Sequence, residues 1–116
     1  MRTVTIFLLA AALALAADVT GKWKFTVETE MGTGNPTFVL KQDGEQLSGT
    51  YSGQLGEAPV TGSVKGDKVE IQIEVAPQGD KILVKYSGTL EGEDKMKGSV
   101  EFGSLGKGTF TAERDK

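Results

Sequence analysis

The sequence contains no cysteine and no histidine, and it has a single tryptophan and three prolines among its 116 residues. Without cysteine the chain forms no disulfide bonds, so the fold must be held by burial of apolar side chains, which is feasible at this size. The same absences remove the commonest general base, the thiolate nucleophile and the usual zinc ligands. They are the strongest functional indication in the composition, and they argue against an enzyme and against a zinc site.

Charge is also too sparse and too evenly spread to suggest a polyanionic partner. The formal net charge is −3 at pH 7, and no basic cluster occurs along the chain. A weakly acidic chain without a basic patch argues against nucleic acid or anionic lipid as a partner.

One apolar run is present, and it lies at the start of the chain. Met1-Arg2 is followed by an apolar segment that ends in Ala14 and Ala16, two small residues in the spacing of a signal-peptidase site. The run is shorter than the roughly 18 residues that a membrane span needs. We therefore predict a signal peptide over residues 1–16, cleaved after Ala16 or after Ala17. Residues 17–116 are then expected to be a single domain, secreted or periplasmic, with no membrane contact after cleavage.

The rest of the sequence alternates between apolar and polar residues with a period of two, as in residues 68–75 (KVEIQIEV), and all 16 glycines lie after the leader. This alternation is typical of half-buried β-strands, whereas no helical period occurs. It predicts eight strands, at about residues 22–29, 36–42, 46–54, 58–65, 68–76, 81–91, 95–103 and 107–114.

The turn sequences test this pattern because a hairpin loop fixes which residues face one another. Loops at 43–44, 66–67, 78–79, 92–94 and 104–106 all bring apolar residues opposite apolar residues. The expected partners are Leu40 with Leu47, Val64 with Val69, Ile73 with Val84, Leu90 with Met96, and Val100 with Phe110. We predict an all-β fold, an eight-stranded antiparallel up-and-down meander β-barrel. A two-sheet β-sandwich is the alternative, although short loops throughout favour the barrel.

Two features of the chain resemble the calycin superfamily of lipocalins, fatty-acid-binding proteins and avidins. They are Gly21-Lys22-Trp23 on the first strand and Arg114 at the end of the last strand. In that superfamily the tryptophan plugs one end of the barrel and a basic residue lies across the indole, a favourable arrangement for a cation. The resemblance implies that residues 17–116 form a calycin-like domain whose barrel plug is Trp23 with Arg114.

A further set of residues is similar, in order, to the first four strands of avidins. These are residues 19–23, 43–44, 47–51 and 60–62, which cover less than half of the chain. Avidins line their biotin site with several tryptophans, and here Trp23 stands alone, with only Tyr51 at a biotin-contacting position. The similarity implies a shared architecture and not biotin binding.

The predicted strands place 21 large side chains on one face, which would be the barrel interior. They are Trp23, Phe25, Val27, Phe38, Leu40, Leu47, Tyr51, Val60, Val64, Val69, Ile71, Ile73, Val75, Ile82, Val84, Tyr86, Leu90, Met96, Val100, Phe102 and Phe110. Small inward residues accompany them: Gly49, Gly62, Gly88, Gly98, Gly108 and Ala112. An eight-stranded barrel can either fill its interior or hold one small ligand.

Two readings of these small residues stay open. In the first, Gly88, Gly98, Val100 and Ala112 border a cavity for an apolar ligand, with Tyr51 and Tyr86 as the inward hydroxyls. In the second, the glycines let a small barrel bend while large side chains fold over them. The longest connection, residues 30–35, is expected to be a loop that forms a lid over the barrel or a protein contact.

The carboxylates are expected on outward strand positions or in turns, for example Glu70, Glu74 and the acidic turn at residues 91–94. A glycosidase would need two opposed carboxylates in a cleft. We therefore predict no catalytic residues, no cofactor and no metal. The expected function is an exported binding module that carries a small hydrophobic ligand. The alternative is a solid barrel whose loops bind or inhibit another exported protein.

Overall fold

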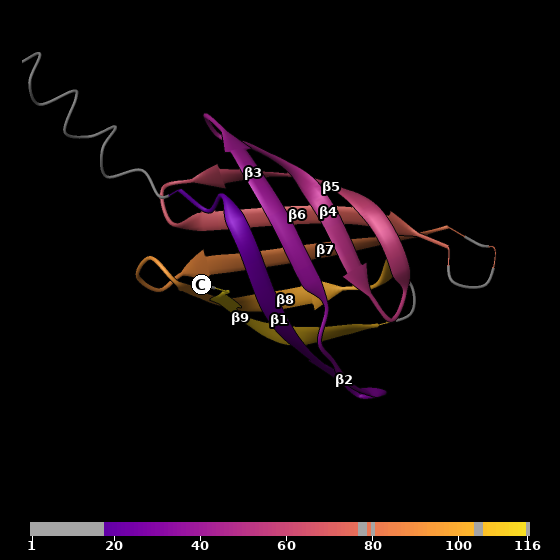
Figure 1. The fold of residues 1–116 in the computed structure, drawn as a ribbon. Coiled ribbons are helices and arrows are strands. Elements are labelled where there is room, and N and C mark those ends of the chain that lie inside the picture. Colours follow the sequence, from indigo (N-terminus) through magenta and orange to yellow (C-terminus); the bar gives the residue numbers. More distant parts are fainter. Residues whose placement is uncertain (1–17, 77–78, 80, 104–105, 116) are drawn as a thin grey trace, which may run out of the picture.

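The computed structural model describes residues 18–76, 79, 81–103 and 106–115, and the predicted signal peptide lies outside them. The described chain consists of nine β-strands in one sheet (Figure 1). They are β1 (Gly21–Thr29), β2 (Gly32–Gly34), β3 (Thr37–Asp43), β4 (Gln46–Gly53), β5 (Gly56–Lys65), β6 (Lys68–Val75), β7 (Ile82–Leu90), β8 (Lys95–Glu101) and β9 (Lys107–Arg114).

The sheet closes on itself as an up-and-down barrel. Strands from β3 to β9 pair antiparallel in sequence order, β1 pairs with β3, and β9 returns to pair with β1 from Trp23↔Arg114 to Thr29↔Gly108. Because the first and last long strands pair, neither is left with a free edge, which is the property that distinguishes a barrel from a sandwich. The prediction of an eight-stranded antiparallel barrel is confirmed, and the sandwich alternative is excluded.

Three of the predicted turn registers are also confirmed. Val64 lies opposite Val69, Ile73 lies opposite Val84, and Leu90 lies opposite Met96.

Two predicted registers are wrong by two residues. The β3–β4 loop is Gly44-Glu45 and not Asp43-Gly44, so Leu40 faces Gly49 instead of Leu47. Gly44 has a φ of 65°. A two-residue hairpin loop of the II′ type needs a positive φ at its first central position, and glycine supplies this without strain.

The β8–β9 connection is longer than predicted, although Ser104 and Leu105 themselves lie outside the described residues. Val100 pairs with Gly108 instead of Phe110, and Phe110 pairs with Gly98. The longer connection is closed by a hydrogen bond of 2.8 Å from the Phe102 amide to the Gly106 carbonyl. The shift places the large Phe110 ring opposite a residue without a side chain, where it can be accommodated.

The predicted loop at residues 30–35 is instead a hairpin that continues β1. Strand β2 pairs with β1 from Val27↔Gly34 to Thr29↔Gly32, in the same register as the pairing of β1 with β3. A hydrogen bond of 3.0 Å from the Phe25 amide to the Pro36 carbonyl bridges the two pairings. We call residues 27–34 the hairpin arm. The arm extends past the end of the barrel (Figure 1), and Met31 at its tip is 79% exposed.

The barrel interior is a continuous apolar core without buried polar or charged side chains among the described residues. All of the predicted inward side chains are buried except Ile82 and Phe102, which are partly buried and pack against the core from its edge. Val19, which precedes β1, and Ala58 join the core although they were not predicted to do so.

Candidate functional site

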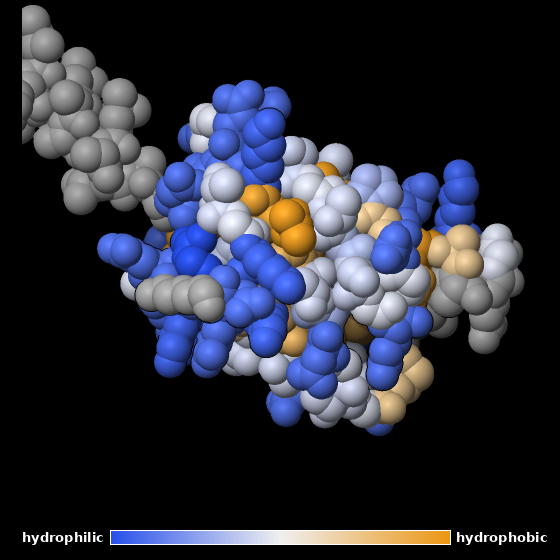
Figure 2. Space-filling model, viewed as in Figure 1, coloured by the Kyte–Doolittle hydropathy of each residue, from blue (hydrophilic) through white to orange (hydrophobic). Residues whose placement is uncertain are grey.

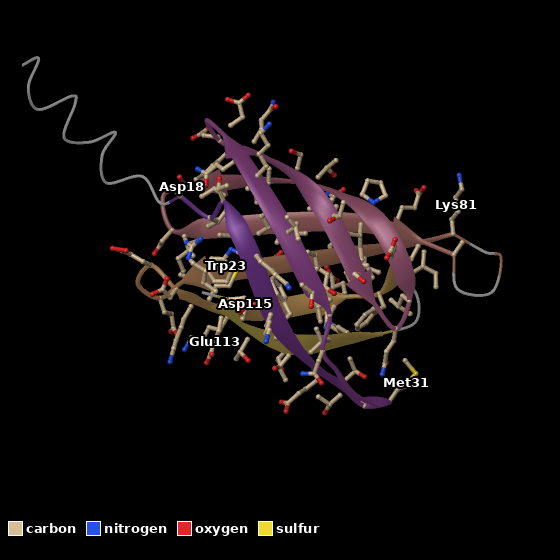
Figure 3. All side chains as sticks on the ribbon, in the orientation of Figure 1. Asp18, Trp23, Met31, Lys81, Glu113 and Asp115 are labelled. Carbon is tan, nitrogen blue, oxygen red and sulfur yellow. The ribbon has the colours of Figure 1, made fainter. Side chains whose placement is uncertain are left out.

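One end of the barrel is closed by side chains, and the opposite end carries a pocket. Trp23 and Asp115 lie at one end, which we call the closed end, and Met31 and Lys81 lie at the opposite, open end (Figure 3). Hydrophilic residues gather near the closed end, while residues of intermediate or high hydropathy cover much of the middle of the face shown (Figure 2). The candidate ligand site is at the open end.

A pocket of about 330 Å³ opens there, near the lower limit of the roughly 300–1,000 Å³ that small-molecule sites occupy. Its wall is built from the hairpin arm, the β4–β5 turn, the start of β7 and the residue after β8. The lining residues are Val27, Thr29, Met31, Gly32, Thr33, Gly34, Asn35, Pro36, Tyr51, Gln54, Leu55, Ile82, Tyr86 and Phe102. The sequence predicted Tyr51 and Tyr86 for a ligand site, and the structure brings these two together.

Tyr86 forms the floor of this pocket. The residue is only 2% exposed, and its ring packs edge-on against Phe25, Phe38 and Phe110 at centroid distances of 5.2 to 5.6 Å. Such contacts fix the orientation of the ring. Burial, and secondarily the nearby Tyr51, raises the pKa of the Tyr86 hydroxyl well above its usual value, so the group is a neutral donor at physiological pH.

Within the described part of the chain, the Tyr86 hydroxyl has no hydrogen-bond partner. No fully buried side-chain oxygen or nitrogen among the described residues is left unsatisfied. The two observations together mean that the hydroxyl reaches the pocket surface. A buried ring thus presents one unpartnered polar atom to the pocket.

The second tyrosine is anchored by the rim of the pocket. Burial raises the pKa of the Tyr51 hydroxyl, and a hydrogen bond from the backbone amide of Leu55 opposes this rise. A tyrosine hydroxyl can donate its proton as well as accept, so Tyr51 offers the pocket a second donor beside Tyr86. Gly53 makes room for this hydroxyl, since a Cβ atom there would lie 2.7 Å from it.

The other four residues predicted for a ligand site do not line the pocket. Val100 and Ala112 are buried in the core, and the space beside Gly88 is taken by Phe110, whose Cζ atom would lie 2.7 Å from an added Cβ. At Gly98 an added Cβ would lie 1.9 Å from the Ser87 carbonyl oxygen. These small residues therefore allow close packing of strands and of one large ring, as the second reading of the sequence holds.

The closed end is consolidated by Arg114. Its guanidinium carbon lies 4.6 Å from the centroid of the fully buried Trp23 ring. Trp23 donates from its indole nitrogen to the Val19 carbonyl at 2.9 Å. The guanidinium donates to four oxygens at 2.7 to 3.1 Å: the carbonyls of Asp18, Thr20 and Glu93, and the Asp94 carboxylate.

Gly21 is required by this arrangement. A Cβ atom at this position would lie 3.1 Å from the Arg114 Nη1 atom, and the φ of Gly21 is 137°. Both the crowding and the left-handed backbone conformation favour glycine. The glycine of the G-x-W sequence thus lets the arginine approach the tryptophan.

The acidic side chains that the sequence singled out do not line the pocket. Glu70, Glu74, Glu91 and Glu93 are exposed on strands and turns, and no group of three or more potential ligands could hold a metal ion within the described ranges. No helix in the described residues is long and apolar enough to cross a membrane.

Three apolar side chains line the pocket together with the two tyrosines. Leu55, Ile82 and Phe102 are partly buried and pack on the edge of the core. Leu55 was not among the predicted inward residues, because it lies in a turn. An apolar residue between Gln54 and Gly56 in an otherwise polar hairpin turn was the available signal.

Comparisons of this chain with known protein families, with curated proteins and with solved structures found no match.

Proposed function

We propose that this protein is an exported, non-enzymatic binding module of calycin-like architecture that holds a small, largely apolar ligand in the pocket at the open end. The observation that carries the proposal is the pocket itself, in which apolar side chains surround the Tyr86 hydroxyl, a polar atom without a protein partner. Ligand sites typically combine an apolar wall with a few placed polar groups.

The residues at the closed end support the calycin-like assignment. The cation of Arg114 over the Trp23 ring, with the arginine supplied by the last strand, matches the arrangement that the sequence resemblance implies.

The non-enzymatic part of the proposal is supported by the residue types that line the pocket. None of the described lining residues is an acid, and the chain has no histidine or cysteine to act as a general base or thiolate nucleophile.

The experiment is a titration of the purified protein with the neutral dye phenylnaphthylamine, whose fluorescence rises in an apolar environment. Leu55→Trp should fill the pocket mouth and weaken dye binding by about tenfold or more, because the pocket is small. Val39→Trp is the matched control, since Val39 is 49% exposed and does not line the pocket. Absence of any dye enhancement, or equal loss in both variants, would contradict the proposal.

One observation favours a second candidate, a module that binds another exported protein through the hairpin arm. Among the described strands, β2 pairs only with β1, and Met31 beside it is exposed. An unpaired edge can accept a further strand from a partner. Glu30→Lys reverses a charge at the exposed tip beside Met31, outside the pocket lining. It should weaken such an interaction and leave dye binding in the pocket largely intact, which separates the two candidates.

A further inference from the structure

The chemistry of the pocket narrows the class of ligand that it can hold, an inference that rests on the proposed function. None of the described residues that line the pocket is Asp, Glu, Lys or Arg. A charged group entering the pocket would lose part of its hydration without gaining an opposite charge, which is unfavourable. Arg114 does not contact the pocket, because it lies at the opposite end and its guanidinium bonds to four oxygens there.

The polar groups that the pocket does offer are donors in its interior and uncharged groups at its rim. The interior donors are the hydroxyls of Tyr86 and Tyr51, and the rim carries the amides of Asn35 and Gln54. Three phenylalanine rings hold the Tyr86 ring in place and so fix the position of its hydroxyl oxygen at the pocket surface. An apolar ligand that covers this hydroxyl without accepting its proton would leave a buried donor unpaired, and that costs free energy.

We infer that the ligand is an uncharged molecule with an apolar body and one hydrogen-bond acceptor, such as a ketone, ether or ring nitrogen, and that this acceptor binds the Tyr86 hydroxyl. The apolar body contacts Leu55, Ile82 and Phe102 at the mouth. Anions such as fatty acids are disfavoured, because the pocket lining contains no cation to compensate for their lost hydration.

The test uses three probes of nearly the same shape, each competing with phenylnaphthylamine for the purified protein. Acetylnaphthalene carries a neutral acceptor, isopropenylnaphthalene has the same outline without the acceptor, and naphthoate is an anion. We expect acetylnaphthalene to bind about three- to tenfold more tightly than isopropenylnaphthalene, the range of one net hydrogen bond. Naphthoate should bind at least about tenfold more weakly than acetylnaphthalene, because its charge is desolvated without compensation.

Tyr86→Phe removes only the hydroxyl and is expected to abolish the preference for acetylnaphthalene without weakening isopropenylnaphthalene. Tyr51→Phe removes the other interior donor and so shows which of the two hydroxyls the acceptor binds; this variant should keep the preference for acetylnaphthalene. The urea midpoint of each variant reports its folding. An unchanged preference in Tyr86→Phe would overturn the role of this hydroxyl, and equal binding of naphthoate would overturn the requirement for a neutral ligand. In both of these cases dye binding persists and the proposed function stands, whereas failure of the dye itself to bind would remove the proposed function.

Discussion

Replacement of Arg114 by methionine tests whether the closed end is a structural clamp. The substitution keeps an apolar stem of similar length and removes the guanidinium that lies over Trp23 and bonds to Asp94. It also leaves three backbone carbonyl oxygens without their donor. No strand is broken and no large cavity is made, so the loss of stability reports the guanidinium.

The size of this loss can be worked from the contacts. A cation over an indole contributes about 0.5–2 kcal/mol, depending on exposure, and the Arg114 side chain is only 20% exposed. The ion pair with Asp94 is worth less than about 1 kcal/mol near the surface. Hydrogen bonds from charged donors contribute about 1.5–3 kcal/mol each, but the freed carbonyls lie near solvent and regain water, so only a fraction is lost. We expect a decrease in the free energy of unfolding of about 3 kcal/mol.

Urea unfolding followed by the fluorescence of Trp23 is the assay, because this is the only tryptophan in the chain. A loss of about 3 kcal/mol lowers the midpoint by about 1.5–2 M for a slope of about 1.5–2 kcal/mol/M. Arg114→Lys should lose roughly half as much, since it keeps the charge but not the planar fork of donors.

Lys22→Met is the matched control for loss of a cation at the same end. Lys22 pairs with Asp115 at 3.6 Å through a side chain that is 55% exposed, so its loss should cost less than about 0.5 kcal/mol. If Arg114→Met were no more destabilising than Lys22→Met, the clamp would be refuted.

Three further predictions follow from the core, the tyrosines and the leader. Gly98→Ala should lower the free energy of unfolding, measured in urea, by about 1–3 kcal/mol, because the added Cβ would lie 1.9 Å from a backbone oxygen. Gly34→Ala is the control and should have little effect, because the nearest atom to its added Cβ lies at 3.7 Å. Equal effects of the two substitutions would contradict the packing argument. Burial raises the pKa of Tyr86 and Tyr51 above its usual value. The contribution of these two tyrosines to the free energy of unfolding should therefore be constant below about pH 10 and fall above it, as they ionise first in the unfolded chain. Tyr86→Phe should reduce that fall, and absorbance near 295 nm follows the ionisation. Expression of the full chain in a secreting bacterium should give a product whose intact mass corresponds to cleavage after Ala16 or after Ala17. An uncleaved exported chain would contradict the predicted signal peptide.

Much of the barrel could be predicted from sequence because its determinants are local. Alternation with a period of two decides which face of each strand is buried, and a short turn decides the pairing that follows it. Where the turn was unambiguous, as between Val64 and Val69, the predicted pairing is confirmed. Where glycine could occupy either central position, as at Gly44, the pairing shifted by two residues and the buried face was preserved.

The hairpin arm and the pocket could not be predicted, because both depend on contacts between distant segments. Glycine has a low intrinsic preference for strands, so residues 32–34 resemble a loop. Their strand conformation comes from continuing the ladder of β1 beyond the barrel. The pocket wall likewise combines Leu55, Ile82 and Phe102, which come from three separate connections and meet only after the barrel has closed.

The two ends of the barrel show how this chain separates stability from binding. At the closed end the Arg114 guanidinium makes four hydrogen bonds to protein oxygens, so a ligand there would have to displace interactions that already exist. At the open end the Tyr86 hydroxyl has no protein partner in the described structure. Its hydrogen bond must therefore be made with water or with a ligand. If Tyr86 served only for packing, phenylalanine would fit at this position. The three rings that contact it, Phe25, Phe38 and Phe110, are all phenylalanines. Packing alone therefore does not account for the Tyr86 hydroxyl, and the proposed ligand contact gives it a role.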